Sequence, residues 1–240
     1  MDLIPVIDLL QGQVVRGIAG NRKAYRPIES LLCRSSDPLV VARCLCEYAA
    51  ADTLYIADLD ALQAGAPQLG VLLRLLEELP PSITLWLDAG FADAATAQRL
   101  FDTLGPQAGR VWPVFASESL SSAEALEACV SDPQKPALLS LDRRDGQRMD
   151  PAGCWDRPAL WPERVIVMTL ERVGSGGGPD LQTLAKVAET AAATGITPRL
   201  IGAGGIASED DLRHAQAAGA SAWLVASALH DLRLERKRPV

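Results

Sequence analysis

The sequence predicts an α/β fold, a closed (β/α)8 barrel of parallel strands, and three observations carry this prediction. Eight short apolar runs rich in β-branched residues alternate with longer amphipathic stretches along the 240 residues. Two of the runs lead to an aspartate followed by nearly the same turn, Asp8 before LLQGQ and Asp142 before RRDGQ. Further matches between the halves indicate an internal duplication. Eight repeats of strand and helix favour a barrel over the alternative, an open doubly wound sheet.

The expected strands lie at residues 3–7, 53–57, 83–87, 110–114, 137–141, 165–169, 198–202 and 222–226. The expected helices span 37–50, 67–79, 92–104, 122–131, 180–194 and 208–218. Ser208 is a candidate N-cap, because acidic residues follow it in the first turn of an amphipathic stretch. Segment 148–164 contains three prolines, so we expect a loop there with one short turn of helix.

The duplication extends beyond the two aspartates. The second and sixth strands lead into ADLDALQAGAP and TLERVGSGGGP, which pairs Asp58 with Thr169, and DAGFAD matches AGGIAS after the third and seventh strands. Each half therefore supplies one acid at the carboxyl end of a strand, where parallel barrels present their catalytic groups. For a single aspartate, the alternative is a turn-former or a helix cap.

Composition bounds the class of protein. With 48% hydrophobic and 22% charged residues, the chain can bury a large core, and we expect one domain over residues 1–240. A formal charge of −7 argues against nucleic acid or an anionic membrane as partner. The five cysteines form no CxxC motif and there are only two histidines, so we expect neither a disulfide framework nor a metal site. The start resembles a strand rather than a signal peptide, and no apolar run is long enough to span a membrane, which predicts a cytoplasmic protein.

The loops after the last three strands predict a phosphate cradle. They are rich in glycine and small residues, which leave backbone N–H groups free to approach an anion, and loops at this place bind phosphate in many such barrels. Tight turns between strand and helix are the alternative interpretation. The candidate phosphate-binding residues are Gly177, Gly178, Gly204, Gly205, Ala226 and Ser227.

These motifs together resemble a known family over nearly the whole chain. The segments IPVIDLLQGQVVRG, ADLDALQAGAP, SLDRRDGQ, GAGGIASEDDL and VASAL are similar to the HisA/HisF family of histidine biosynthesis, and to its isomerase branch in particular. The resemblance implies a TIM barrel with two-fold internal symmetry. It also implies an Amadori rearrangement of a phosphorylated aminoaldose to an aminoketose, with no metal or organic cofactor.

The resemblance assigns roles to individual residues. Asp8 matches the family's general base, Asp142 its general acid, and Thr169 a threonine that assists catalysis. One acid gives a proton to the furanose ring oxygen while the other takes a proton from C2, and burial can separate the pKa values of the two carboxyl groups to suit both tasks. The candidate substrate-binding residues are Arg16, Asn21, Arg22 and Arg143, for which a solvated surface role is the alternative.

The chain departs from the family at the second phosphate cradle. Where the isomerase has glycine-rich turns after the third and fourth strands, this sequence has DAGFAD and PVFASES. Asp88 places an anion where a phosphate is expected, and Phe91 and Phe115 add apolar bulk. One phosphate site therefore matches the family and the other is rebuilt.

Three functions fit this pattern. The departures favour a HisA-like enzyme outside histidine biosynthesis, for example in the biosynthesis of one-carbon carrier cofactors, acting on a small metabolite with one phosphate. The first alternative is the aldose–ketose isomerase of histidine biosynthesis itself, and the second is a phosphate-ligand-binding protein without catalysis. The related cyclase, which works with a glutaminase partner, is disfavoured because no docking surface is recognisable. The pattern leaves the substrate and the oligomeric state open.

Overall fold

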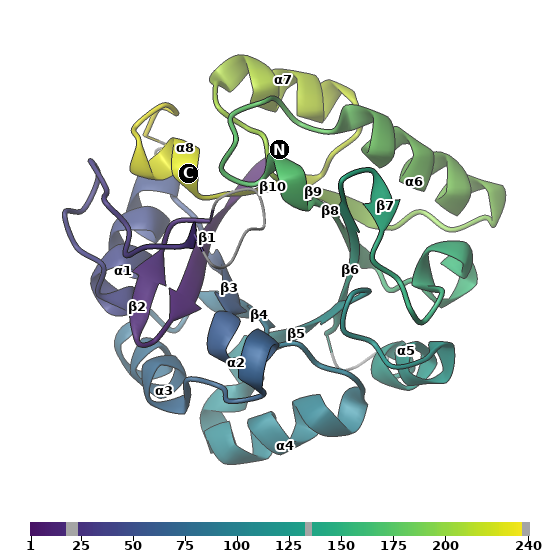
Figure 1. The fold of residues 1–240 in the computed structure, drawn as a ribbon, viewed down its shortest axis with the longest axis horizontal. Helices are drawn as coiled ribbons and strands as arrows, with labels where there is room; N and C mark the ends of the chain where they lie inside the picture. The colour runs from purple at the N-terminus through teal and green to yellow at the C-terminus, as the bar shows by residue number, and fades with distance from the viewer. Residues whose placement is uncertain (18–23, 133–135, 237–240) are drawn as a thin grey trace.

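The computed structural model describes residues 1–17, 24–132 and 136–236, which form a closed barrel of eight parallel strands surrounded by helices (Figure 1). Each barrel strand pairs with the next along the chain, and β10 pairs with β1 to close the barrel. The predicted fold is therefore confirmed. The barrel strands are β1 Asp2–Leu10, β3 Thr53–Asp58, β4 Thr84–Asp88, β5 Val111–Ala116, β6 Leu138–Arg144, β8 Arg164–Thr169, β9 Arg199–Ala203 and β10 Ala222–Val225.

The helices cover the outside of the barrel. They are α1 Pro38–Ala49, α2 Leu59–Ala64, α3 Leu69–Glu78, α4 Ala94–Leu104, α5 Ala123–Val130, α6 Leu181–Ala193, α7 Glu209–Ala217 and α8 Ser227–His230. Short 3-10 helices span Gly105–Arg110, Cys154–Asp156, Pro158–Leu160 and Leu170–Arg172. Two of these lie in the proline-containing segment after β6, which was expected to hold one turn. Within the described ranges, no helix is both long and apolar enough to cross a membrane.

Side-chain caps fix the start of several helices. Ser208 accepts a hydrogen bond from the amide of Asp211 at the start of α7, so the predicted cap is confirmed. Asp93 caps α4 in the same way, and each cap lies three residues after a glycine with positive φ, Gly90 at 67° and Gly205 at 86°. Helix α2 was not predicted, and it forms because Asp58 at the end of β3 caps its first turn.

The two aspartate motifs fold into matching hairpins. Strand β2 Gln13–Val15 pairs antiparallel with β1, and β7 Gln147–Arg148 pairs antiparallel with β6. Both turns place two consecutive residues at positive φ, 50° and 79° at Gln11-Gly12 and 51° and 76° at Asp145-Gly146, as in a type I′ turn. The strands consequently do not end at the aspartates but continue for two residues beyond them.

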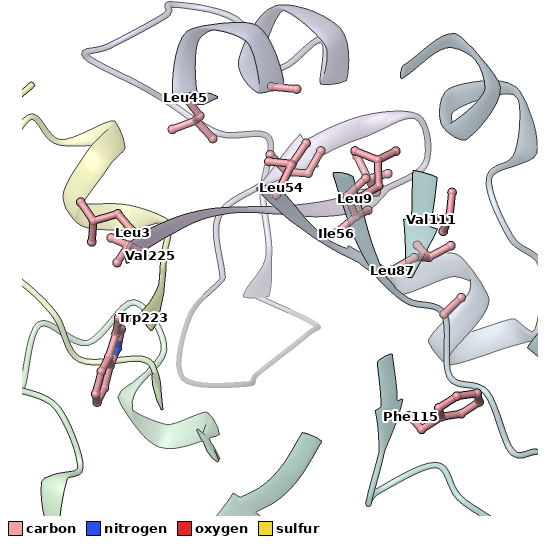
Figure 2. Close-up of a cluster of buried hydrophobic side chains, with 14 of the residues drawn as sticks. Leu3, Leu9, Leu45, Leu54, Ile56, Leu87, Val111, Phe115, Trp223 and Val225 are labelled. Atoms are coloured by element: carbon pink, nitrogen blue, oxygen red, sulfur yellow. The ribbon is translucent and has the colours of Figure 1, made fainter. Parts of the chain in front are cut away.

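The hydrophobic core has two layers, as the alternation of side chains along a strand requires. One layer lies between the strands and the helices, and Figure 2 shows part of it, with Leu45 of α1 near Leu54 of β3. The other fills the barrel, and every strand contributes to it at least one of the buried side chains Ile4, Tyr55, Trp86, Val114, Leu138, Ile166, Ile201 and Leu224. Above this inner layer, at the carboxyl ends of the strands, the barrel opens into a cavity.

Candidate active site

The cavity at the carboxyl ends of the strands brings the two predicted acids together. Asp8 of β1 and Asp142 of β6 both line it. Asp88 also lines it, from β4, which lies between β1 and β6 in the barrel. Tyr55 of β3 lines it from deeper in the barrel, two residues before Ala57, which pairs with Asp8. Glu118, in the loop after β5, lines the same cavity. Catalytic groups of (β/α)8 barrels lie at this end of the strands, so the cavity is the candidate active site.

Asp142 is almost fully buried and sits in a network of hydrogen bonds. The residue is 4% exposed. Ser140 Oγ donates to its Oδ1 at 2.6 Å, and the Glu118 amide donates to its Oδ2 at 3.3 Å. Ser117 Oγ lies 3.1 Å from the same Oδ2 and accepts from the Asp142 amide at 2.8 Å. Burial raises the pKa of Asp142 from 3.8 to about 8, with the charges of Glu118 and Asp88 adding to the rise. The carboxyl group therefore carries a proton at neutral pH, as a general acid must.

Asp8 is placed differently. It lies on β1 between Val15 of β2 and Ala57 of β3, and it is partly exposed to the cavity. A Cβ atom at Gly17 would come within 2.8 Å of Asp8 Oδ2, so the chain passes close to this carboxylate. Unequal solvation of two carboxyl groups in one site is the condition under which one keeps its proton and the other ionises.

The glycine-rich loops form the opposite wall of the cavity. Four of the candidate phosphate-binding residues, Gly204, Gly205, Ala226 and Ser227, line the cavity, and residues 174–176 form the part of its wall contributed by the loop after β8. Gly177 and Gly178 are not among the residues that line the cavity. The Gly177 carbonyl accepts a hydrogen bond from Arg172, and the Gly178 carbonyl lies next to Gly205. A Cβ atom at Gly205 would overlap the Gly178 carbonyl and reach within 2.9 Å of Pro179 N, which explains why only glycine fits there.

Two predicted site residues point away from the cavity. Thr169 Oγ1 donates to Asp180 Oδ2 at 3.0 Å, and Arg143 Nη1 lies 3.4 Å from the same oxygen. Asp180 is the N-cap of α6, outside the barrel. Successive side chains of a strand alternate between faces, so Arg143 faces the helices because Asp142 faces the interior. The structure therefore does not bring Thr169 or Arg143 to the two acids.

The remaining predicted substrate-binding residues lie at or beyond the edge of the site. Arg16 Nη2 forms an ion pair with Asp231 Oδ1 at 2.7 Å and donates to the Glu29 carbonyl at 2.9 Å. Asp231 lines the cavity and Arg16 stands behind it. Asn21 and Arg22 lie outside the described residues.

Sequence reasoning missed Tyr55, Arg144 and Glu118, all of which line the cavity. Arg144 lies two residues after Asp142 on the same strand, and its buried Nε atom has no hydrogen-bond partner among the residues that the structure describes. Tyr55 donates its hydroxyl to Asp88 Oδ2 at 3.2 Å. Burial and the charges of Asp88, Asp142 and Asp8 raise the pKa of Tyr55 well above 10, so it is a neutral donor. Counting every second residue from each aspartate would have identified Arg144.

The half-barrel symmetry shows how the second cradle differs from the first. In the amino-terminal half, the turn after β4 uses the Gly90 amide to bind Asp88 Oδ1 at 3.1 Å. The loop after β5 uses Ser117 and the Glu118 amide to bind Asp142. The donors that correspond to the glycine-rich wall are therefore occupied by the protein's own carboxyl groups. In the described part of the chain, no three His, Cys, Asp or Glu side chains are arranged to hold a metal ion.

Fold and site together define a symmetric (β/α)8 barrel in which Asp8 and Asp142, one from each half, line one cavity with a glycine-rich wall beside them. Residues 2–235 match the family described as histidine biosynthesis protein, and the chain belongs to that family. The resemblance predicted from the motifs is thereby confirmed.

Three relatives illustrate the range of the family. An uncharacterized protein of Methanocaldococcus jannaschii is 27% identical over 237 residues, covering 96% of this chain and 93% of that protein. An isomerase of Desulforamulus reducens is 29% identical, covering 89% of this chain and 84% of its own. An isomerase of Herpetosiphon aurantiacus is 26% identical, and the match covers 96% of this chain and 93% of that isomerase. Both isomerases are named for an imidazole-4-carboxamide substrate with two phosphoribosyl groups.

Proposed function

We propose that the chain is an acid–base isomerase of the aldose–ketose type that acts on a small metabolite with one phosphate. The proposal places it outside histidine biosynthesis, in a pathway such as that of a one-carbon carrier cofactor. The observation that carries it is the difference between the two half-barrel cradles. Gly204 and Ser227 border the cavity, and the Gly205 amide donates to the Arg172 carbonyl at 3.0 Å, whereas the amides of Gly90 and Glu118 donate to the carboxyl groups of Asp88 and Asp142.

The charge of the amino-terminal side supports a single phosphate. Asp88 is 7% exposed, and it shares this side of the cavity with Glu118. A phosphate placed there would meet like charges in a poorly solvated site, which costs several kcal/mol unless cations compensate (about 4 kcal/mol for two unit charges 4 Å apart at an effective dielectric of about 20). The phosphate of the substrate therefore lies against the glycine-rich wall, and its far end lies near Asp88.

The two acids would share the proton transfers. The protonated Asp142 donates to the ring oxygen of the substrate while the bond from that oxygen to C1 breaks, and a lone pair of the substituent on C1 forms the C=N or C=O bond of the open chain. The ionised Asp8 removes the proton from C2, and the electron pair of that C–H bond forms the enol or enamine double bond. C1 then takes up a proton while the C2 hydroxyl loses its own, which forms the C2 ketone, so no oxidant or reductant is needed.

A comparison of two ligands tests the number of phosphates. Binding of ribulose 5-phosphate and ribulose 1,5-bisphosphate to the purified protein would be measured by isothermal titration calorimetry, with Gly205→Ala as the variant that disturbs the wall. We expect the second phosphate to add no affinity, and both ligands to bind more weakly to Gly205→Ala. A bisphosphate that binds at least tenfold more tightly would contradict the single-phosphate proposal.

A second candidate function, the isomerase step of histidine biosynthesis, is favoured by the names of the relatives. It is tested by complementation of a histidine auxotroph that lacks this isomerase. We expect no growth with well-expressed protein, and growth that is lost in both Asp8→Asn and Asp142→Asn would establish the second function instead. A non-catalytic role would be indicated if neither substitution changed any phenotype of the native host.

A further inference from the structure

Arg144 lines the cavity without a partner for its charge. Its Nε atom is buried and unpaired, and no ion pair or side-chain hydrogen bond of this residue is found within the described ranges. The neighbouring arginines of the same hairpin are paired, Arg143 of β6 with Asp180 and Arg148 of β7 with Asp156. A partly buried guanidinium group without a counter-charge is unfavourable for the protein alone. A ligand that supplies the missing acceptor would remove this cost.

The backbone places Arg144 between Asp142 and the mouth of the barrel. Side chains two residues apart on a strand point to the same face, and their Cα atoms lie about 7 Å apart. Arg144 pairs with Gln147 of β7, and the Gly146 amide in the turn between these strands donates to Glu171 Oε1 at 3.4 Å. The guanidinium group is therefore positioned by paired strands, on the same face as the general acid and one step nearer the mouth.

Among the described residues, the other cation that lines the cavity lies at its glycine-rich wall. Arg233 Nη2 is 3.8 Å from Asp231 Oδ2, and Arg233 Nη1 would be 3.6 Å from a Cβ atom at Gly176. Arg233 thus belongs to the side proposed for the phosphate. The charged groups that line the rest of the cavity in these residues, apart from Arg144, are the acids Asp8, Asp88, Glu118 and Asp142. Away from the wall, a negative group of a ligand therefore finds a described cation only at Arg144.

We propose that Arg144 is a substrate-binding residue that selects a carboxylate at the end of the substrate remote from its phosphate. This inference rests on the proposed function, in which the phosphate lies against the glycine-rich wall. The coplanar N–H groups of a guanidinium match the two oxygens of a carboxylate, and the single charges of the two groups balance. With the phosphate on the last carbon of the sugar, the remote end is the group carried by C1. That group lies beside Asp142, which opens the ring at C1.

A second phosphate fits Arg144 less well than a carboxylate does. A phosphate monoester has a charge of about −1.5 to −2 at neutral pH, and one arginine neutralises only one unit of it. The backbone amides of Gly90 and Glu118 cannot bind the remaining charge, because they already donate to the carboxyl groups of Asp88 and Asp142. Arg144 therefore favours a substrate with one phosphate and one carboxylate over a bisphosphate.

The test compares two sugar phosphates that differ at one carbon. 6-Phosphogluconate has a carboxylate at C1, whereas sorbitol 6-phosphate has a hydroxymethyl group there, and the two share the phosphate and the rest of the chain. Isothermal titration calorimetry would measure the Kd of both ligands for the full-length wild type, Arg144→Gln and Arg148→Gln. We expect the wild type to bind 6-phosphogluconate about tenfold more tightly than sorbitol 6-phosphate, as a charge-assisted pair provides. Arg144→Gln should lose this preference by weakening 6-phosphogluconate alone.

Arg148→Gln is the matched control, because it removes the same charge from the same hairpin at a position that does not line the cavity. It should keep the preference. Equal affinity of the wild type for the two ligands, or a preference that survives in Arg144→Gln, would overturn the role of Arg144 and leave the single-phosphate proposal standing. If Arg144→Gln fails to fold, Arg144→Lys decides. It keeps the charge without the coplanar N–H pair, so a preference equal to that of the wild type would overturn the paired contact.

Failure of the proposed function would be visible separately, in Gly205→Ala. This variant disturbs the glycine-rich wall, so it should weaken both ligands by the same factor and keep the ratio of their affinities. If Gly205→Ala binds both ligands as tightly as the wild type does, the proposed position of the phosphate is wrong, and the inference that rests on it is overturned as well.

Discussion

Replacing Asp142 by asparagine should make the protein more stable at neutral and mildly alkaline pH. Burial raises the pKa of Asp142 from 3.8 to about 8, so between these values the folded chain holds a proton that the unfolded chain has released. Rising pH then favours the unfolded state, and the stability present below the unfolded pKa is lost as pH rises to the folded pKa. Each pH unit in this window corresponds to about 1.4 kcal/mol. From about pH 5 to pH 8, this single group lowers the free energy of unfolding by up to about 4 kcal/mol.

Asparagine does not titrate, and it can still accept a hydrogen bond from Ser140 and exchange one with Ser117. The assay is urea unfolding followed by circular dichroism, for the wild type, Asp142→Asn and the exposed control Asp102→Asn, at several pH values in this range. We expect the stability difference between Asp142→Asn and the wild type to grow with pH by a few kcal/mol. A difference that stays constant with pH would refute the assignment of a buried, protonated acid.

Three further changes test the surroundings of the site. Gly205→Ala places a Cβ atom against the Gly178 carbonyl at a φ of 86°, and should lower stability by about 1–3 kcal/mol together with phosphate affinity, as thermal unfolding and calorimetry would show. Gly202→Ala overlaps the ring of Trp223 behind the barrel wall, and should lower the melting temperature without a change in the two acids. Asp180→Ala removes the cap of α6, and should cost about 1 kcal/mol in urea unfolding, whereas Asp180→Asn should retain most of it.

The fold could be predicted from the sequence because its signals are local and repeated. Apolar runs separated by amphipathic stretches identify the strands, and the shared spacing from aspartate to glycine identifies the two hairpins. The hairpin strands themselves were not predicted, since Gln13–Val15 and Gln147–Arg148 are too short for a periodic pattern. The glycines after β9 were placed correctly because their spacing relative to a strand and a helix cap is typical of such loops.

The orientation of individual side chains was harder to predict. Thr169 was chosen because it matches a threonine of the family and Arg143 because it lies beside Asp142, but a one-residue step along a strand reverses the face. Both therefore contact Asp180 instead of the cavity. Tyr55 belongs to a strand that carries no predicted catalytic residue, and its contact with Asp88 depends on the closure of β3 against β4. Such contacts between strands are not visible in a single sequence.

The hairpins of β1–β2 and β6–β7 have a consequence for how this barrel can change. Asp8 and Asp142 lie within continuous, paired strands and not in the loops that surround them, so the distance between the acids is set by the frame of the barrel. Insertions or substitutions in the loops after β3 and β4 can reshape the substrate pocket and leave this distance untouched, whereas the loop after β5 contacts Asp142 through Ser117 and the Glu118 amide. Reactivity and selectivity are thus held by separate parts of the chain, and one can evolve while the other is conserved.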